Sequence, residues 1–284
     1  MRRWRSKVGI IVPNLSPTWR PKASHPLNKG LIALAAFCEG SGTPRGYGRR
    51  FNAWLTKAGT PAWAPRSGSG RFPARIAANL PTSGDDWRFT AGTTDYIPTN
   101  RITYAFVRKR GGTANTNSPS FGREDNATTA ERAGAHCPYN DGTVYWDFGG
   151  TGSPNRLTWS GYSATTDVEV WVFVAGTRGS AIYLNGAVKA SQATGITRSQ
   201  AVGYVGVNTG NGITTSEANS VLMFGMWDAE WTAADVTLFY KGLSTWDLLE
   251  SIPDPIRYLD KAAAAAGGVF TPYFYQQHIA RTAA

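Results

Sequence analysis

The chain has 284 residues, of which 42% are hydrophobic, 12% aromatic and only 17% charged. This length can bury one large core or two modest ones, and many glycines and aromatics with few charges favour a β-rich fold over long helical faces. Two cysteines exclude a disulfide framework or a cysteine-rich zinc site, and the longest apolar run, LIALAAFC, is too short to span a membrane.

The net charge of +10 is divided unevenly along the chain. Residues 1–110 carry 19 Lys and Arg against 4 Asp and Glu, whereas residues 111–284 carry 10 against 15. Such a split is typical of contact with an acidic partner, either nucleic acid or an acidic protein surface. For the scattered arginines a solvated basic surface is the favoured interpretation, but the concentrated start MRRWRSK favours a partner.

Residues 1–24 are predicted to form an extended basic arm, because prolines at 13, 17 and 21 block both a helix and a central strand. The apolar run VGIIV is too short for a signal peptide, so we expect no secretion by the usual route. Four cations and a stackable tryptophan suit contact with DNA or with an acidic protein. The candidate partner-binding residues of the arm are Arg2, Arg3, Trp4, Arg5 and Lys7.

The next hundred residues contain short apolar segments broken by Gly, Pro and Ser clusters. TDYIP (94–98) and RITYAFVRKR (101–110) are predicted strands, and in the second Ile102, Tyr104 and Phe106 alternate with residues of the opposite face. Residues 111–130 are polar and rich in Asn and Thr, which predicts an exposed loop.

From residue 131 the strand signal is strong. Asn185-Gly186 between two of these strands predicts a type I′ turn, because both residues tolerate positive φ. Thr232 and Asp235 have the spacing of a capping box and Gly242 can end the helix, so a short helix is expected there, as a plug or edge cover of the sandwich. The predicted strands are GTVYWDFGG, NRLTWSG, VEVWVFVAGT, SAIYLNG, AVKAS, AVGYVGV and SVLMFGMWD, at intervals typical of a sandwich or barrel.

Residues 244–284 change composition again, with WDLLESIPDPIRYL, five alanines and an aromatic end. No core of its own is available to this segment, and exposed aromatic tails usually dock on another surface. We therefore take Tyr273, Phe274 and Tyr275 as a candidate partner-binding tail.

Five blocks, in order, resemble the laminin-G-like, concanavalin A-like jelly rolls of many tailed-bacteriophage proteins, over residues 25–243. The resemblance implies an all-β fold, a two-sheet antiparallel jelly-roll sandwich with one short C-terminal helix and extended terminal arms at 1–24 and 244–284. The blocks are HPLNKGLIALAAFCEGSGT (25–43), residues 70–98 with RFPARIAANL and TTDYIP, WVFVAGTRGSAIYLNGAVKAS, VGYVGVNTGNG and FGMWDAEWTAADVTLFYKG.

Enzymatic members of this fold hydrolyse glycosides with carboxylates that face each other across a sugar. The Glu-x-Asp-x-x-Glu strand that they carry is absent here. The pairs Asp167/Glu169 and Asp228/Glu230 have strand spacing, but we interpret them as solvent-facing charge. There is no Gly-x-Ser-x-Gly elbow and no phosphate loop, so we expect a protein that is not an enzyme and has no catalytic residues.

The histidines and cysteines give no catalytic or metal pattern. His25, His136 and His278 lie in unlike contexts and are interpreted as structural. Cys38 and Cys137 are interpreted as two buried thiols, with a single bridge between them as the alternative.

Two kinds of ligand site were weighed against ordinary structural roles. Calcium occurs in some laminin-G-like domains, but the loop at 208–219 offers only Asn208, Asn211 and Glu217, so a polar turn is favoured and no cofactor or metal is expected. A glycan site needs an exposed aromatic beside hydrogen-bonding groups. Its candidates are Asn155, Trp159 and Tyr162, with a core role as the alternative for the aromatics.

The sequence hypothesis is a non-enzymatic structural virion protein of a tailed phage, made in the host cytoplasm. It would decorate or stabilise the capsid or a nearby virion part as a multimer, with other virion proteins as partners of its arms, since arms that order on a neighbour bury long contacts. Contact of the N-terminal arm with DNA stays open, and no membrane is involved. The alternative is a glycan-binding host-adhesion protein, and a glycoside hydrolase ranks third.

Overall fold

The computed structural model describes most of the middle of the chain, and the predicted arm and tail residues from Arg2 to Lys7 and from Tyr273 to Tyr275 lie outside it. Residues 21–249 form one compact unit, and the residues before and after form another. The described ranges are 18–37, 43–48, 53–54, 56–60, 62–65, 76–80, 86–90, 98–110, 120–123, 132–139, 141–165, 167–198, 204–208, 219–242 and 248–252.

Near the two ends of the described chain, β1 (Thr18–Pro21) and β19 (Leu249–Ile252) pair as a two-stranded sheet. β1 lies within residues 1–24, the segment predicted as an extended arm. No helix in the described part of the chain is both long and apolar enough to cross a membrane.

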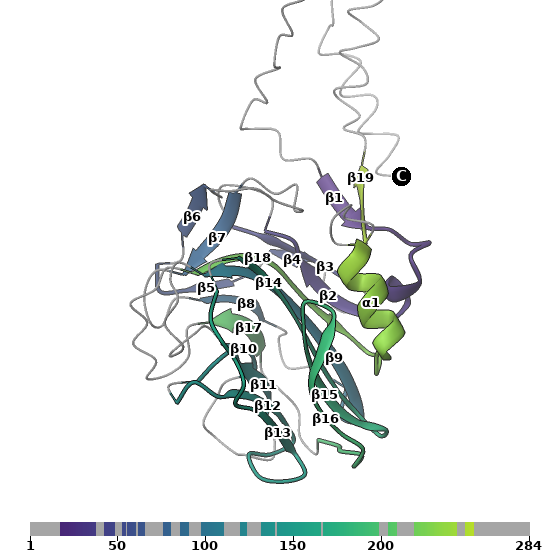
Figure 1. Ribbon diagram of the computed structural model, residues 1–284. Helices are drawn as coiled ribbons and strands as arrows, with labels where there is room; N and C mark the ends of the chain where they lie inside the picture. The colour runs from purple at the N-terminus through teal and green to yellow at the C-terminus, as the bar shows by residue number, and fades with distance from the viewer. Residues whose placement is uncertain are drawn as a thin grey trace, which may run out of the picture. The chain divides into compact units, whose positions relative to one another are not determined.

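Seven strands of the large unit form one antiparallel sheet, in the order β13-β12-β11-β10-β17-β8-β5 (Figure 1). Each pair of neighbours is antiparallel, as expected of a jelly roll. The bounds are β5 Thr56–Ala58, β8 Asp86–Thr90, β10 Ser120–Arg123, β11 Ala133–His136, β12 Val144–Phe148, β13 Arg156–Trp159 and β17 Tyr204–Asn208.

Ten strands form the second sheet, in the order β16-β15-β14-β9-β18-β2-β3-β4, with β7 pairing the start of β18 and β6 pairing β7. A 3₁₀ turn, η1 (Pro26–Gly30), precedes β2, and the helix α1 (Ala233–Gly242) follows β18. The bounds are β2 Leu31–Ala35, β3 Arg45–Tyr47, β4 Ala53–Trp54, β6 Ala62–Pro65, β7 Ile76–Leu80, β9 Arg101–Arg110, β14 Val168–Gly176, β15 Gly179–Leu184, β16 Ala187–Gln192 and β18 Asn219–Trp227.

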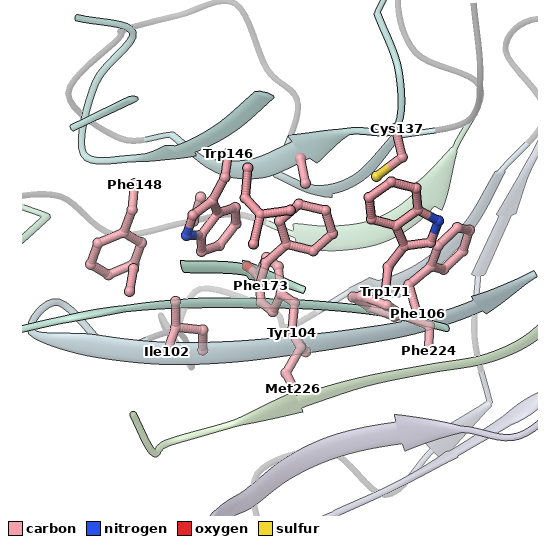
Figure 2. Close-up of a cluster of buried hydrophobic side chains, with 14 of the residues drawn as sticks. Ile102, Tyr104, Phe106, Cys137, Trp146, Phe148, Trp171, Phe173, Phe224 and Met226 are labelled. Carbon is pink, nitrogen blue, oxygen red and sulfur yellow. The ribbon is translucent and has the colours of Figure 1, made fainter. Parts of the chain in front are cut away.

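The core fills the space between the inner faces of the two sheets, and aromatic rings from both sheets interlock there (Figure 2). Trp146 of β12 lies 5.4 Å from Tyr104 and 5.5 Å from Phe173, centroid to centroid. Its indole Nε1 donates to the Val174 carbonyl of the other sheet at 2.9 Å. The alternation along β9 that places Ile102 and Tyr104 inward therefore decides which residues meet the facing sheet.

The short helix predicted from the sequence is present as α1, which packs against part of the outer face of the ten-stranded sheet, at Trp227 of β18. The Asp235 carboxylate accepts from the Thr232 amide at 2.8 Å, and the Asp235 amide donates to the Thr232 hydroxyl at 3.3 Å, which completes the capping box. Phe239 packs on Trp231 and Trp227, with ring centroids 5.2 and 6.0 Å apart.

The predicted β-turn is also confirmed. Asn185 and Gly186 have φ of 53° and 81°, as a type I′ turn requires. The Asn185 side chain accepts from the Val170 amide at 2.9 Å, so this residue ties the hairpin to β14. A side chain at Gly186 would come within 2.9 Å of the Tyr240 ring of α1. The close approach of α1 is therefore a second reason, besides the positive φ, why this position requires glycine.

The all-β, two-sheet antiparallel sandwich with one short helix is therefore confirmed, and one prediction within it is wrong. Residues 111–130 are not a continuous loop, because Ser120–Arg123 forms β10 and pairs with β11 and β17. The predicted strand at 94–98 lies mainly outside the described residues, as does Cys38, while Cys137 is buried in the core.

One ion pair lies inside this apolar interior. Arg108 of β9 and Glu169 of β14 are register partners, and neither side chain is exposed to solvent. Arg108 Nη2 lies 2.7 Å and Nε 2.8 Å from Glu169 Oε2. Burial is the largest single influence and lowers the pKa of Arg108, but Glu169, Tyr162 and Cys137 together outweigh it and hold that pKa above its ordinary value.

The pair is embedded in hydrogen bonds that reach the other sheet. Arg108 Nη2 also donates to the Cys137 carbonyl, which follows β11. The Tyr162 hydroxyl donates to Glu169 Oε1 at 2.6 Å, and Trp171 Nε1 donates to Glu169 Oε2 at 3.0 Å. Removing one charge would leave the other desolvated and uncompensated.

We expect Glu169→Gln to lower the free energy of unfolding by about 3–5 kcal/mol, because Arg108 then stays buried without a counter-charge. Denaturant unfolding followed by tryptophan fluorescence measures this. Asp167→Asn, an exposed carboxylate two residues away, is the matched control and should change stability by less than about 0.5 kcal/mol. Equal stability of both variants and the parent would contradict the account.

Candidate functional site

The residues proposed from sequence for glycan contact lie beside the core. Tyr162 is only 5% exposed and its hydroxyl is bound to Glu169. Asn155 is partly buried and donates to the Gly149 carbonyl at 3.2 Å. Trp159 keeps part of its surface, and the Lys189 ammonium lies 5.5 Å from its ring centroid. Burial removes Tyr162 from a direct sugar contact, so the three residues form no common exposed platform.

Three of the four acidic residues singled out from sequence are engaged by arginines, whereas Asp167 is exposed as expected. Solvent exposure is the wrong interpretation for Glu169, which is fully buried against Arg108. Asp228 lies 2.8 Å from Arg101 Nε, and Glu230 lies 3.4 Å from Arg178 Nε.

The other candidate ligands of the sequence stand as follows. Asn208 belongs to β17, whereas Asn211, Glu217 and His278 lie outside the described residues. His25 Nδ1 accepts from the Leu27 amide at 3.3 Å at the start of η1, a structural role. Within the described ranges, no three His, Cys, Asp or Glu side chains gather into a metal site.

A different group of side chains gathers on the outer face of the seven-stranded sheet. Along β12, Val144, Trp146 and Phe148 enter the core, so Tyr145 is directed to the opposite face. Tyr139 follows β11 and is 37% exposed, and its ring centroid lies 5.9 Å from that of Tyr145.

We call Tyr139, Asp141, Tyr145 and Arg156 the tyrosine patch. The Arg156 guanidinium lies 4.4 Å from the Tyr145 ring centroid, a cation–π contact. The Tyr145 hydroxyl donates to Asp141 Oδ2. Two phenol rings, a carboxylate and a guanidinium thus form one connected surface.

The patch is held in place from below by Asp147. This carboxylate accepts from Arg156 Nε and Nη2, both at 2.6 Å, and from Arg132 Nη1 at 3.1 Å. The bidentate bond with Asp147 raises the pKa of Arg156. Arg156 is therefore fixed in orientation while its side chain stays 25% exposed.

Asp141 is an ionised acceptor in this arrangement. Partial burial raises its pKa, but hydrogen bonds from the Tyr145 hydroxyl and from Thr143 outweigh this, and the pKa of Asp141 lies below its ordinary value. The same hydrogen bond raises the pKa of Tyr145, so the phenol keeps its proton at neutral pH. The patch offers both donors and acceptors beside aromatic faces.

A row of glycines begins beside Asp147, the support of the patch. Gly134 of β11, Gly122 of β10 and Gly206 of β17 are register partners on three neighbouring strands, and Gly134 is also the partner of Asp147. Ala135, next to Gly134, belongs to the core, so the glycine row lies on the outer face. Strand glycines mark places where a ligand can approach the backbone closely.

Sequence reasoning missed the tyrosine patch, although part of its signal was present. The alternation in GTVYWDFGG places Tyr145 and Asp147 opposite Trp146 once that tryptophan is assigned to the core. Arg156 joins them only through the register of β12 with β13, where Asp147 and Arg156 are partners. No local pattern in the sequence contains that register.

No family model matches this sequence, and no curated protein does. Solved structures are similar in fold at low identity. The botulinum neurotoxin serotype D ligand-binding domain in complex with N-acetylneuraminic acid has a TM-score of 0.55 and 12% identity over 76% of this chain and 52% of its own. The receptor-binding domain of the botulinum neurotoxin C/D mosaic serotype has a TM-score of 0.56 and 13% identity over the same shares.

The binding domain of botulinum neurotoxin DC in complex with rat synaptotagmin II gives a TM-score of 0.55 and 12% identity, again over 76% of this chain and 52% of that one. This chain therefore spans about half the length of the neurotoxin domains it resembles. At such identities the likeness establishes a shared lectin-like β-sandwich fold.

His136, which packs edge-on against Tyr139 at 5.1 Å, makes stability near the patch dependent on pH. Burial lowers the pKa of His136 to about 4, and the Asp147 carboxylate offsets this only in part. An unfolded histidine has a pKa of about 6.5, so the unfolded state binds the proton first and stability falls as the pH drops from about 6.5 to about 4.

We expect this histidine to cost on the order of 3 kcal/mol of stability across that range. His136→Asn should therefore lose less stability between pH 7 and pH 4 than the parent does. Denaturant unfolding at both pH values measures the difference. An identical loss in parent and variant, or an imidazole NMR titration near pH 6.5, would contradict the assignment.

Proposed function

We propose that this chain is a non-enzymatic jelly-roll module that binds carbohydrate through the tyrosine patch. The observation that carries the proposal is the surface formed by Tyr139 and Tyr145 beside Asp141 and Arg156. Aromatic rings pack on the apolar face of a sugar, while a carboxylate and a guanidinium bind its hydroxyls. Asp147 holds Arg156 in place beforehand, which reduces the entropy lost on binding.

The glycine row supports an oligosaccharide as the ligand in place of a single sugar. From Asp147 the row crosses β11, β10 and β17, a span of about 14 Å at the usual strand spacing of about 4.8 Å. Because glycine has no side chain, an oligosaccharide that starts at the patch can lie directly against the backbone at these three positions.

The neurotoxin structures suggest which sugars to test first. The serotype D domain is in complex with N-acetylneuraminic acid, the DC domain is in complex with SialylT, and cell entry of type C depends on interaction with two ganglioside molecules. Those properties belong to the neurotoxins. Because the fold is shared, sialylated glycans are a reasonable first panel for this chain.

The non-enzymatic part of the proposal is supported by the state of the acidic residues. A glycosidase needs two carboxylates that face one sugar. Glu169 is enclosed with Arg108, and Asp228 and Glu230 are each bound to an arginine. In the tyrosine patch, Asp141 has a lowered pKa, the opposite of what a general acid requires.

A second proposal, compatible with the first, is a structural protein in the virion of a tailed phage. It is favoured by the order of five sequence blocks over residues 25–243, which resembles the jelly rolls of such phages. In this role the chain is made in the host cytoplasm, joins other virion proteins as a multimer, and uses its terminal segments as anchors. Glycan binding would then serve attachment of the particle to its host.

Tyr145→Ala should weaken binding of the preferred glycan about tenfold or more, equivalent to about 1.4 kcal/mol, because it removes one ring and the bond to Asp141. A glycan array followed by titration calorimetry measures this. Tyr145→Phe keeps the ring and should lose less. Leu238→Ala is the control, because Leu238 is an exposed residue of α1, the helix that packs on the ten-stranded sheet. A tight ligand unaffected by Tyr145→Ala, or silence on a broad array, would refute the patch as glycan site.

For the virion role, deletion of residues 1–17 leaves β1 in place and removes the basic segment. We expect incorporation into phage particles to fall strongly, since the cations and Trp4 are the candidate anchor. Neutralising Arg2, Arg3, Arg5 and Lys7 to Gln in the full chain tests the charge alone. Normal incorporation of both variants would contradict anchoring by this segment.

A further inference from the structure

A polar cleft lies within the compact unit of residues 21–249, apart from the tyrosine patch. Its volume is about 610 Å³, within the usual range for sites that take small molecules. It lies where η1, the start of β9, the β14–β15 turn and the segment between β18 and α1 meet. The lining residues that matter for its chemistry are Lys29, Arg101, Arg178, Asp228, Glu230 and Asp235.

The segment between β18 and α1 that forms one wall is firmly held. The Asp228 amide donates to the Gly30 carbonyl at 2.8 Å. The Thr103 hydroxyl donates to the Ala229 carbonyl at 2.8 Å and accepts from the Trp231 amide at 3.2 Å. This wall is therefore already formed before any ligand arrives.

Arg101 and Arg178 are each anchored by one carboxylate and remain accessible. Arg101 donates through Nε to Asp228 Oδ1 at 2.8 Å, and its side chain is 51% exposed. Arg178 Nε lies 3.4 Å from Glu230 Oε2, its Nη2 donates to the Glu230 carbonyl, and its side chain is 61% exposed. A guanidinium has five N–H donors, so each arginine has donors beyond those in these bonds.

The carboxylates of the cleft already have partners within the protein. Glu230 Oε1 accepts from the Arg178 amide at 2.9 Å, and a side chain at Gly176 would collide with Glu230 Oε2, so the carboxylate lies directly on β14. Asp235 Oδ2 accepts from the Thr232 amide and hydroxyl at 2.8 and 2.7 Å. Each carboxylate of the cleft thus has a partner within the protein, and each arginine keeps N–H donors beyond its own bonds.

We propose that this cleft is a second binding site, separate from the tyrosine patch, for a small molecule that carries a carboxylate or phosphate group. The oxyanion binds the guanidinium N–H groups of Arg101 and Arg178, which suit it because they can donate in pairs to one anion. Three cations and three carboxylates balance in the cleft, so recognition depends on directed hydrogen bonds more than on net charge.

The test is titration of the full chain with glucuronate, glucose and inorganic phosphate, followed by calorimetry and ligand-observed NMR. We expect glucuronate or phosphate to bind at least tenfold more tightly than glucose. If glucuronate alone binds, the ligand is an acidic sugar or related carboxylate; if phosphate alone binds, it is a phosphate ester. No preference of either anion over glucose would overturn the proposal.

Variants locate the site. Arg101→Gln and Arg178→Gln should each weaken anion binding at least fivefold, and Lys189→Gln, which removes a cation elsewhere, should leave it unchanged. Arg101→Lys keeps the charge but not the paired donors and should bind more weakly than the parent. Tyr145→Ala should have no effect, so failure of the glycan proposal leaves this one standing. Unchanged binding in folded Arg101→Gln and Arg178→Gln, judged by melting temperature, would overturn the assignment.

Discussion

The ion pair between Arg108 and Glu169 is the constraint on which the rest of the sandwich depends. Two charges removed from water gain stability only if their geometry and remaining hydrogen bonds are satisfied. In this protein the hydrogen bonds of the pair depend on the register of β9 with β14. They also depend on the Cys137 carbonyl, which follows β11 in the chain, and on the Tyr162 hydroxyl, which follows β13. These bonds link β9 and β14 of one sheet to the segments that follow β11 and β13 of the other.

The packing of the two sheets encloses an interior that a ligand cannot reach, and it leaves outer surfaces that differ in their chemistry. The inner faces interlock through Trp146, Tyr104 and Phe173, so recognition has to take place elsewhere. The outer face of the seven-stranded sheet carries the tyrosine patch and the glycine row. On the ten-stranded sheet, α1 packs against Trp227 of β18, and its first turn borders the polar cleft. Aromatic rings favour sugars at the first surface, and spare guanidinium donors favour an oxyanion at the second.

The sequence predicted the elements whose signals are local. The strand at 101–110, the Asn185-Gly186 turn and the Thr232/Asp235 capping box depend on neighbours in the chain, and all three are confirmed. Sequence-based prediction failed for features that depend on residues far away in the chain. Ala133–His136 is short and three of its four residues are Ala or Gly, and Ser120–Arg123 lies in a polar segment, so only pairing across the sheet makes them strands. Glu169 reads as a surface charge until its partner 61 residues away is known. The patch has the same origin, since Arg156 reaches Tyr145 through strand register.

The central claim is that recognition occurs on the outer face of the seven-stranded sheet. Amide hydrogen exchange of the full chain, with and without a glycan that it binds, tests this most directly. The account predicts slower exchange with glycan in the segments that hold the patch and the glycine row, namely residues 120–123, 132–147, 156–159 and 204–208, and little change in α1. Protection confined to the segments around the polar cleft, or to none of these strands, would contradict it.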